Sequence, residues 1–238
     1  MSKLSVIIPT LNESSNAYFP RILESLSTMR EIEIIISDGG STDNTLKLAE
    51  YSQVKILSNQ TSSRAERLNY GLKEATGEII LLHHPRSLIS LEGIEHLLSM
   101  TSHLHWGGFT HSFDFRHPLL KFTSWYSNNI RGGISGIIYL DHCIFLKREV
   151  LQKFGELPKV DIFEDTILSQ ILLEKYGKPT ILPHLVETSA IRFRTNGIWK
   201  QALLNQYLKI KFHLNGNHKK MNELYEKDIS LNSKYERK

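Results

Sequence analysis

Cysteine, long apolar runs and phosphate-binding glycine loops are all scarce in this 238-residue sequence. Its single cysteine, Cys143, excludes an internal disulfide and a cysteine metal site, and we interpret it as an inert core thiol. No apolar run approaches the ~20 residues that a membrane-spanning helix needs. The first apolar run is short and stops at Pro9, so we expect no signal peptide and a cytoplasmic protein.

Negative charge is scarce at the end of the chain. Residues 191–238 carry 11 Lys and Arg against 4 Asp and Glu, a balance of +7 within a whole-chain net charge of +4. The preceding part of the chain is therefore mildly acidic, and we expect no nucleic-acid partner. An ordinary solvated end accounts for this charge, and the alternative is an end that contacts an anionic membrane surface or nucleic acid.

Apolar runs alternate with amphipathic segments in the first half of the chain. Predicted strands cover residues 5–8, 33–36, 54–57 and 78–82. Predicted helices lie between them, at residues 20–29, 46–49 and 63–75. Strands separated by helices of this length form parallel βαβ units with right-handed crossovers.

The second half predicts longer elements. We expect strands over residues 106–115 and 137–146, and helices over residues 119–130, 166–176 and 197–214. The polar chain from about residue 215 is expected to fray. Trp125, Tyr126 and Trp199 recur at helical spacing, which is more typical of core residues than of a sugar-stacking surface.

Ligands of open α/β sheets bind at the carboxyl ends of the strands, near the switch in strand order. The loops at these ends are residues 10–13, 38–43 and 83–87. No GxGxxG motif opens the first helix, and the sequence has no GxxxxGK[ST] motif. Dinucleotide redox chemistry and P-loop phosphate transfer are therefore disfavoured.

Two of these loops carry recognisable motifs, Ser5-Val-Ile-Ile-Pro-Thr-Leu-Asn-Glu13 and Ile35-Ile-Ser-Asp-Gly-Gly-Ser-Thr-Asp43. Together they resemble the opening of family 2 glycosyltransferases with the GT-A fold. Further segments are similar to the bacterial subgroup labelled as arsenosugar-biosynthesis-type glycosyltransferases, and the resemblance covers roughly residues 3–212. These segments are Arg64–Gly71, Ala75–Glu78, Asp141, Phe145–Arg148, Phe163–Asp165 and Thr188–Ala190.

The resemblance implies a GT-A, Rossmann-like α/β fold, with a mixed, mainly parallel central sheet flanked by helices. It implies a single domain over residues 1–214, with a nucleotide-binding half (about 1–90) and an acceptor and catalytic half (91–214). A basic polar tail, residues 215–238, follows.

The implied activity is transfer of a sugar from a UDP- or GDP-type donor to a hydroxyl acceptor, with inversion of the anomeric carbon. One alternative is a degenerate member that binds a nucleotide or a partner protein without catalysis. A second is a nucleotidyltransferase, but that class is expected to carry a basic, glycine-rich loop after the first strand, where this chain has Thr10-Leu-Asn-Glu13.

The nucleotide site implied by the resemblance begins at Asp38. This residue ends a predicted strand, and its carboxylate can accept hydrogen bonds from the N–H edge of uracil or guanine. The alternative is that Asp38 only caps the following turn, and Glu13 has a similar alternative as a carboxylate near a helix start. The implied nucleotide-binding residues are Pro9, Thr10, Asn12, Glu13, Asp38 and Arg64.

The implied catalytic residues are Asp165 and the preceding Glu164. A carboxylate at Asp165 can remove the acceptor proton while the hydroxyl attacks the anomeric carbon. The alternative is that Asp165 is a helix N-cap, because it precedes Thr166 and an apolar run. Asp141 matches a loop on the acceptor side.

The segment after the fourth strand departs from the family pattern. Family members carry an Asp there that holds Mn²⁺ or Mg²⁺, whereas Pro85 stands at that position here. This puts a divalent metal in doubt, and we assign no metal ligand. Positive charge for the leaving diphosphate would then come from Arg86, from Arg192 or from a protonated His83 or His84. We interpret Arg67 as an ordinary surface charge.

Overall fold

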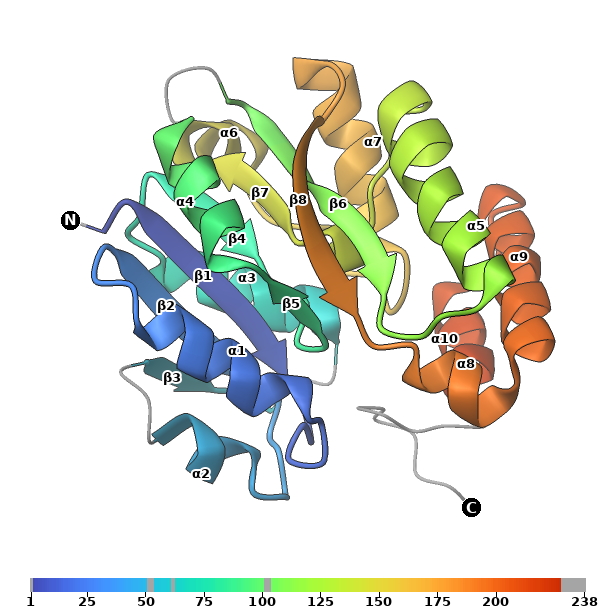
Figure 1. Cartoon of the computed structure of the whole chain (residues 1–238), viewed down its shortest axis with the longest axis horizontal. Coiled ribbons are helices and arrows are strands. Elements are labelled where there is room, and N and C mark those ends of the chain that lie inside the picture. Colours follow the sequence, from blue (N-terminus) through green and yellow to red (C-terminus); the bar gives the residue numbers. More distant parts are fainter. Residues whose placement is uncertain (1, 51–53, 61–62, 101–103, 228–238) are drawn as a thin grey trace.

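The structure is a computed structural model that describes residues 2–50, 54–60, 63–100 and 104–227. Within these residues one sheet of eight strands forms the centre, in the order β3-β2-β1-β4-β7-β6-β8-β5 (Figure 1). The strands are β1 (Leu4–Thr10), β2 (Ile32–Asp38), β3 (Lys55–Ser58), β4 (Ile79–Leu82), β5 (Ser87–Ile89), β6 (Trp106–Phe113), β7 (Ile144–Lys147) and β8 (Thr180–Thr188).

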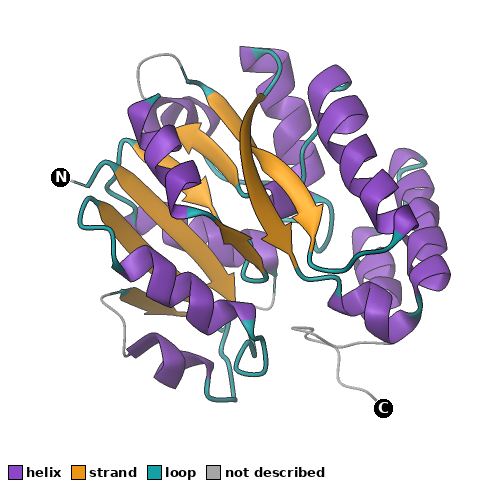
Figure 2. Ribbon diagram, in the orientation of Figure 1, coloured by secondary structure: helices purple, strands orange, loops and turns teal. Residues whose placement is uncertain are grey.

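Helices cover both faces of the sheet (Figure 2). They are α1 (Tyr18–Ser27), α2 (Thr45–Glu50), α3 (Arg64–Glu74), α4 (Leu91–Ser99), α5 (Pro118–Tyr126), α6 (Arg148–Phe154), α7 (Glu164–Tyr176), α8 (Ile191–Asn196), α9 (Ile198–His213) and α10 (His218–Glu226). A π-helical segment, η1 (Ser127–Ile134), continues α5, and a 3₁₀ turn, η2 (Leu140–His142), precedes β7.

Strand β1 shows why the core has two layers. All seven of its residues are buried, and they alternate between the faces of the sheet. Val6 and Ile8 join the core under α1 and α4, whereas Ile7 joins the core under α3 and α7. A strand covered on both faces reads as a continuous apolar run, which is the pattern from which it was predicted.

The sheet topology confirms the predicted mixed GT-A-like arrangement. Strands β3, β2, β1 and β4 are parallel, and β7 joins β4 in the antiparallel direction. Strand β6 pairs antiparallel with β7 and parallel with β8, and β5 closes the edge antiparallel to β8. The loops after β1, β2 and β4 therefore meet at one edge of the sheet, as in other open α/β sheets that bind ligands there.

Two sequence-based expectations are wrong. Residues 137–146 do not form one strand, because the chain turns through η2 and Cys143 takes a left-handed φ of 51° before β7 begins. The chain also does not fray at residues 218–226. These residues form α10, in which Asn217 caps the N-terminus by accepting a hydrogen bond from the Lys220 N–H (3.0 Å), and Met221 is buried.

None of the helices in the described ranges is long and apolar enough to cross a membrane.

Candidate active site

A cavity of about 230 Å³ opens between the loops of the first half and the helices of the second half. Five cationic and two anionic side chains are found among its described lining residues. The cations are Arg64, Arg86, Arg131, Arg192 and Lys209, and the anions are Asp141 and Asp165. The cavity thus offers positive charge together with carboxylates, the combination that transfer of a phosphorylated substrate requires.

Asp165 lies in the first turn of α7, and the residue is only 8% exposed. The N-cap of this helix is Phe163, in a left-handed conformation (φ 68°), so the N-cap alternative for Asp165 does not hold. The carboxylate accepts a hydrogen bond from the Leu140 N–H (2.9 Å). Burial, followed by the charge of Glu164, raises the pKa of Asp165 to about 6, which suits a general base near neutral pH.

Arg64, at the start of α3, connects the two carboxylates of α7. Its guanidinium bonds Glu164 through Nε and lies 3.5 Å from Asp165 through Nη2. Glu164 is 1% exposed, so its charge is directed at Arg64 and not at solvent. These partners hold the pKa of Arg64 above its usual value despite the burial of the guanidinium. Arg64 was predicted as a nucleotide ligand, and the structure places it beside the predicted base.

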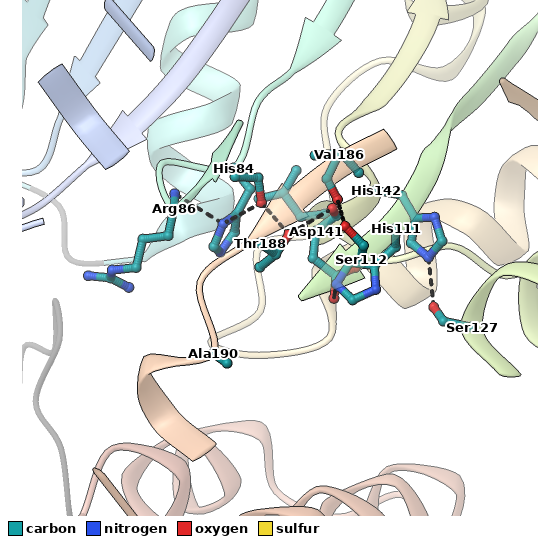
Figure 3. A network of polar contacts seen from close by, with 12 residues as sticks. His84, Arg86, His111, Ser112, Ser127, Asp141, His142, Val186, Thr188 and Ala190 are labelled. Carbon is teal, nitrogen blue, oxygen red and sulfur yellow. Dashed lines mark hydrogen bonds and ion pairs between the residues drawn. The ribbon is translucent and has the colours of Figure 1, made fainter. Parts of the chain in front are cut away.

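Asp141 lies in η2 and lines the cavity near β6 and β8 (Figure 3). His111 Nε2 of β6 is 3.6 Å from its carboxylate, while the Asp141 carbonyl accepts a bond from Thr188 Oγ1 (3.3 Å). Despite its burial, nearby His111, His142 and Arg131 hold the pKa of Asp141 well below its usual range. Within the described chain its Oδ1 and both ring nitrogens of His111 are buried without a hydrogen-bond partner. His111 was not identified from the sequence.

The loop after β4 holds His83, His84, Pro85 and Arg86. Burial lowers the pKa of His83 to about 4 and that of His84 well below its usual value, so both imidazoles are neutral at pH 7. His84 Nδ1 accepts hydrogen bonds from the Arg86 N–H and from Ser87 Oγ, each at 3.2 Å (Figure 3). A protonated histidine therefore has no support here, and the permanent cation of this loop is Arg86.

The same loop does not fit a hard divalent cation. The nearby carboxylate, Glu13, is already bound to Arg86 Nη2 (3.0 Å), and burial raises the pKa of Glu13 to about 7. The Pro85 carbonyl accepts a hydrogen bond from Asn16 Nδ2 (2.7 Å). Among the residues described, no group of three or more His, Cys, Asp or Glu side chains is placed to hold a metal. The donor chemistry that Mn²⁺ or Mg²⁺ prefers is thus not assembled at this loop.

Asp38 is completely buried, and its carboxylate is directed into its own loop. Oδ1 accepts hydrogen bonds from Thr10 Oγ1 (2.9 Å) and Ser41 Oγ (2.5 Å). Oδ2 accepts hydrogen bonds from the N–H groups of Gly40 (2.9 Å) and Ser41 (2.7 Å). Asp38 therefore organises the loop between β2 and α2, and contact with a base would be an additional role.

Two further predicted nucleotide residues stand next to this loop. Asn12 has a left-handed φ of 54°, and its Oδ1 accepts a hydrogen bond from the Thr42 N–H (2.9 Å). Pro9 is buried in β1, where it is in register with Ser37 of β2. None of Pro9, Asn12 and Asp38 is among the lining residues of the cavity, so the proposed base site lies beside it.

Arg192 of α8 reaches the cavity from the opposite side. Its Nη2 forms an ion pair with Glu226 of α10 (2.6 Å), and the guanidinium stacks 4.0 Å from the centre of the Tyr225 ring. Tyr225 itself lines the cavity. The sequence did not indicate that the end of the chain would lie here, because α10 is polar and its contacts with Ile162 and Arg192 join segments that are distant in sequence.

Other functional candidates were also missed or misjudged. Arg131 and Lys209 line the cavity, although neither was identified as a site residue from the sequence. Arg67 is 2% exposed, so the interpretation as a surface charge is wrong. The core interpretation of three aromatic residues is also wrong, because they lie on the outer sides of peripheral helices. These are Trp125 (52% exposed), Tyr126 (43%) and Trp199 (66%).

Comparison with known proteins gives the family context. Residues 5–98 match the sequence profile of Glycosyl transferase family 2. A glucuronosyltransferase of Methanococcus voltae, acting on a dolichyl N-acetylglucosaminyl phosphate by its name, is 32% identical over 93 residues, covering 34% of this chain and 28% of the relative. The uncharacterized glycosyltransferase YibD of Escherichia coli is 36% identical over 86 residues, covering 33% of this chain and 24% of YibD. The matched part is thus about a quarter of the length of these relatives.

Solved structures extend the likeness to almost the whole chain. The mannosyltransferase PcManGT of Pyrobaculum calidifontis, in complex with GDP-Man and Mn²⁺, has a TM-score of 0.65 at 17% identity and covers 96% of this chain and 70% of its own. The glycosyltransferase TarS of Staphylococcus aureus, residues 1–349, has a TM-score of 0.61 at 20% identity. The match covers 82% of this chain and 63% of the TarS chain. The arsenosugar subgroup stays a prediction. Residues 5–98 are therefore similar to glycosyl transferase family 2, and the chain has the GT-A fold of these solved structures.

Proposed function

We propose that the protein transfers a sugar from a UDP- or GDP-type nucleotide sugar to a hydroxyl acceptor, with Asp165 as general base and inversion at the anomeric carbon. The observation that carries the proposal is the placement of Asp165 on the cavity wall, buried, raised in pKa and next to Arg64. Family relatives with nucleotide-sugar transferase names support the same activity.

The proposed step is a single displacement. The acceptor hydroxyl gives its proton to Asp165, its oxygen bonds to the anomeric carbon, and the bond from that carbon to the diphosphate oxygen breaks. Glu164 acts through Arg64, which it holds beside Asp165. The comparisons give no support to the alternative of a degenerate binder without catalysis.

The leaving nucleoside diphosphate is proposed to meet arginine side chains. Arg86 and Arg192 both line the cavity, and a guanidinium can bind phosphate oxygens with two parallel hydrogen bonds. Preorganised positive charge of this kind can stabilise the transition state without a metal ion. The proposed activity is therefore metal-independent or only weakly stimulated by metal.

The nucleoside is proposed to lie beside this cavity, at the loops after β1 and β2. Thr10 and Asn12 would contact base or ribose. Glu13 anchors Arg86, and Asp38 shapes the loop between β2 and α2. Pro9 would contribute by fixing the end of β1. The acceptor is proposed to bind near Asp141 of η2, which lines the same cavity as Asp165.

A membrane surface is the proposed location of the acceptor. Helices α5 and α9 share a small core of Leu120, Phe193, Ile198 and Ala202, and they leave large apolar side chains in solvent on their outer sides. We call these side chains the outer face: Phe122, Trp125, Tyr126, Trp199, Leu203, Tyr207, Ile210 and Leu214. Together with the positive charge of residues 191–238, the outer face suits an anionic cytoplasmic leaflet.

A transfer assay with the Asp165→Asn variant tests the proposed chemistry. The amide keeps the size of the side chain but cannot take a proton, and loss of a general base typically costs ~10²–10⁴ in rate. We expect that loss of sugar transfer with donor affinity within about threefold of wild type. Retention of more than a tenth of the activity would show that Asp165 is not the base.

A further inference from the structure

The five cations of the cavity differ in their partners. Arg64 is bound to Glu164, Arg86 lies 3.0 Å from Glu13, and Arg192 lies 2.6 Å from Glu226. Each of these three charges is therefore balanced by a carboxylate of the chain. Arg131 and Lys209 have no carboxylate within 4.0 Å among the described residues.

Arg131 of η1 and Lys209 of α9 both line the cavity and both approach the ring of Tyr139. The guanidinium carbon of Arg131 is 3.4 Å from the centre of the Tyr139 ring, and Lys209 Nζ is 5.8 Å from the same centre. Arg131 Nη2 contacts Ser127 Oγ, but its Nε is buried without a hydrogen-bond partner in the described chain. Arg131 and Lys209 thus both approach the Tyr139 ring, and they keep hydrogen-bond donors that no acceptor of the described chain uses.

The electrostatics of Lys209 agree with this picture. Burial and the nearby charge of Arg131 lower the pKa of Lys209 to about 8, and only the more distant Asp141 opposes that shift. The ammonium therefore carries its charge at an energetic cost that an anion in the cavity would relieve. Asp141 does not provide that relief by contact, because its carboxylate lies against His111, at 3.6 Å.

We propose that Arg131 and Lys209 bind a phosphate group carried by the acceptor, an inference that rests on the proposed sugar transfer. A phosphate monoester carries about −1.5 to −2 charges at pH 7, which matches two neighbouring cations. The guanidinium offers paired donors and the ammonium a point charge. The acceptor would then be a phosphorylated alcohol whose hydroxyl lies near Asp165 and whose phosphate lies between η1 and α9.

The position of the two cations favours the acceptor over the donor as the source of the phosphate. Arg64 and Arg86 belong to the first half of the chain, at the strand ends where a nucleotide is expected. Arg131 and Lys209 come from the second half, on η1 and α9. The donor diphosphate remains the competing source, and the experiment separates the two.

The test is calorimetric titration of inorganic phosphate into protein saturated with UDP or GDP, with nucleotide affinity measured separately. The variants are Arg131→Gln and Lys209→Gln, and Lys211→Gln is the matched control because it removes the same charge from the exposed side of α9. We expect phosphate affinity to fall at least fivefold in the first two variants and to stay unchanged in the control. Nucleotide affinity should stay within twofold in all three, and acetate should bind wild type more weakly than phosphate does.

The variant Lys209→Arg shows whether a loss in Lys209→Gln reflects the missing charge or misfolding. It keeps the positive charge, so phosphate affinity should stay within about threefold of wild type. Absence of phosphate binding to wild type, or equal binding to all variants, would overturn the proposal. A parallel loss of nucleotide affinity would also overturn it, by assigning both cations to the donor. Failure of the proposed function would be seen separately, as a lack of nucleotide binding. Phosphate binding that is lost in both Arg131→Gln and Lys209→Gln would in that case still support an anion site at these two cations.

Discussion

At the scale of single residues, the pKa of Asp165 sets the expected pH dependence. Its pKa is raised to about 6, so the carboxyl group is protonated below that pH and cannot act as a base. We predict that the transfer rate falls about tenfold for each pH unit below 6 and is flat just above it. A pH–rate profile under donor saturation measures this. A profile that does not change between pH 5 and 7 would contradict the assignment.

Arg86 carries the second prediction at this scale. We propose that the guanidinium of Arg86 supplies the positive charge that a metal ion supplies in related enzymes. Arg86→Ala should then lower the transfer rate at least a hundredfold, as loss of one preorganised donor does in other enzymes. EDTA should leave wild-type activity within about twofold. The control is Arg116→Ala, an exposed arginine that does not line the cavity. If EDTA abolishes transfer and Mn²⁺ restores it, our interpretation of Pro85 is wrong.

At the scale of elements, the loop between β2 and α2 depends on one carboxylate. Asp38→Ala would leave the N–H groups of Gly40 and Ser41 without their acceptor, so we predict a loss of about 1–3 kcal/mol in the free energy of unfolding. Nucleotide affinity should fall at least tenfold, because the loop that we propose as the base site would lose its shape. Chemical denaturation and nucleotide titration measure the two effects. Unchanged stability with unchanged affinity would refute both roles of Asp38.

Helix α10 shows how elements distant in sequence complete the cavity. Its Tyr225 and Glu226 reach Arg192 of α8, and His218 at its start contacts the Ile162 carbonyl next to the catalytic turn (2.8 Å). Phe163 of that turn packs on Phe212 of α9, with ring centres 4.8 Å apart. The last two helices therefore support the turn that carries Asp165, and they are more than a solvated end.

At the scale of the whole molecule, the outer face and the basic end of the chain predict membrane binding. Each Lys or Arg near an anionic surface contributes ~1 kcal/mol, and the exposed aromatic rings add apolar contact. We predict co-sedimentation with anionic vesicles at low salt and release at high salt. Trp125→Ser with Trp199→Ser should weaken binding at least fivefold. Equal partition onto neutral and anionic vesicles would exclude an electrostatic anchor.

The sequence by itself determined the first half of the fold and the similarity of residues 5–98 to glycosyl transferase family 2. Strand β1 was predictable from a local pattern, because a short apolar run ended by a turn signal is typical of a buried strand. The position of Asp165 at the start of a helix was equally readable from the Phe163-Glu164-Asp165 segment.

Only the tertiary structure decided what surrounds that residue. Periodicity along the chain does not report contacts between distant segments, so it could not bring Arg131 and Lys209 to one ring or place Tyr225 on the cavity wall. The neutral state of His84 likewise depends on its burial and on Arg64, which lies on another element. Charge and burial at this site are properties of the assembled helices, because both are set by neighbours that the linear sequence does not specify.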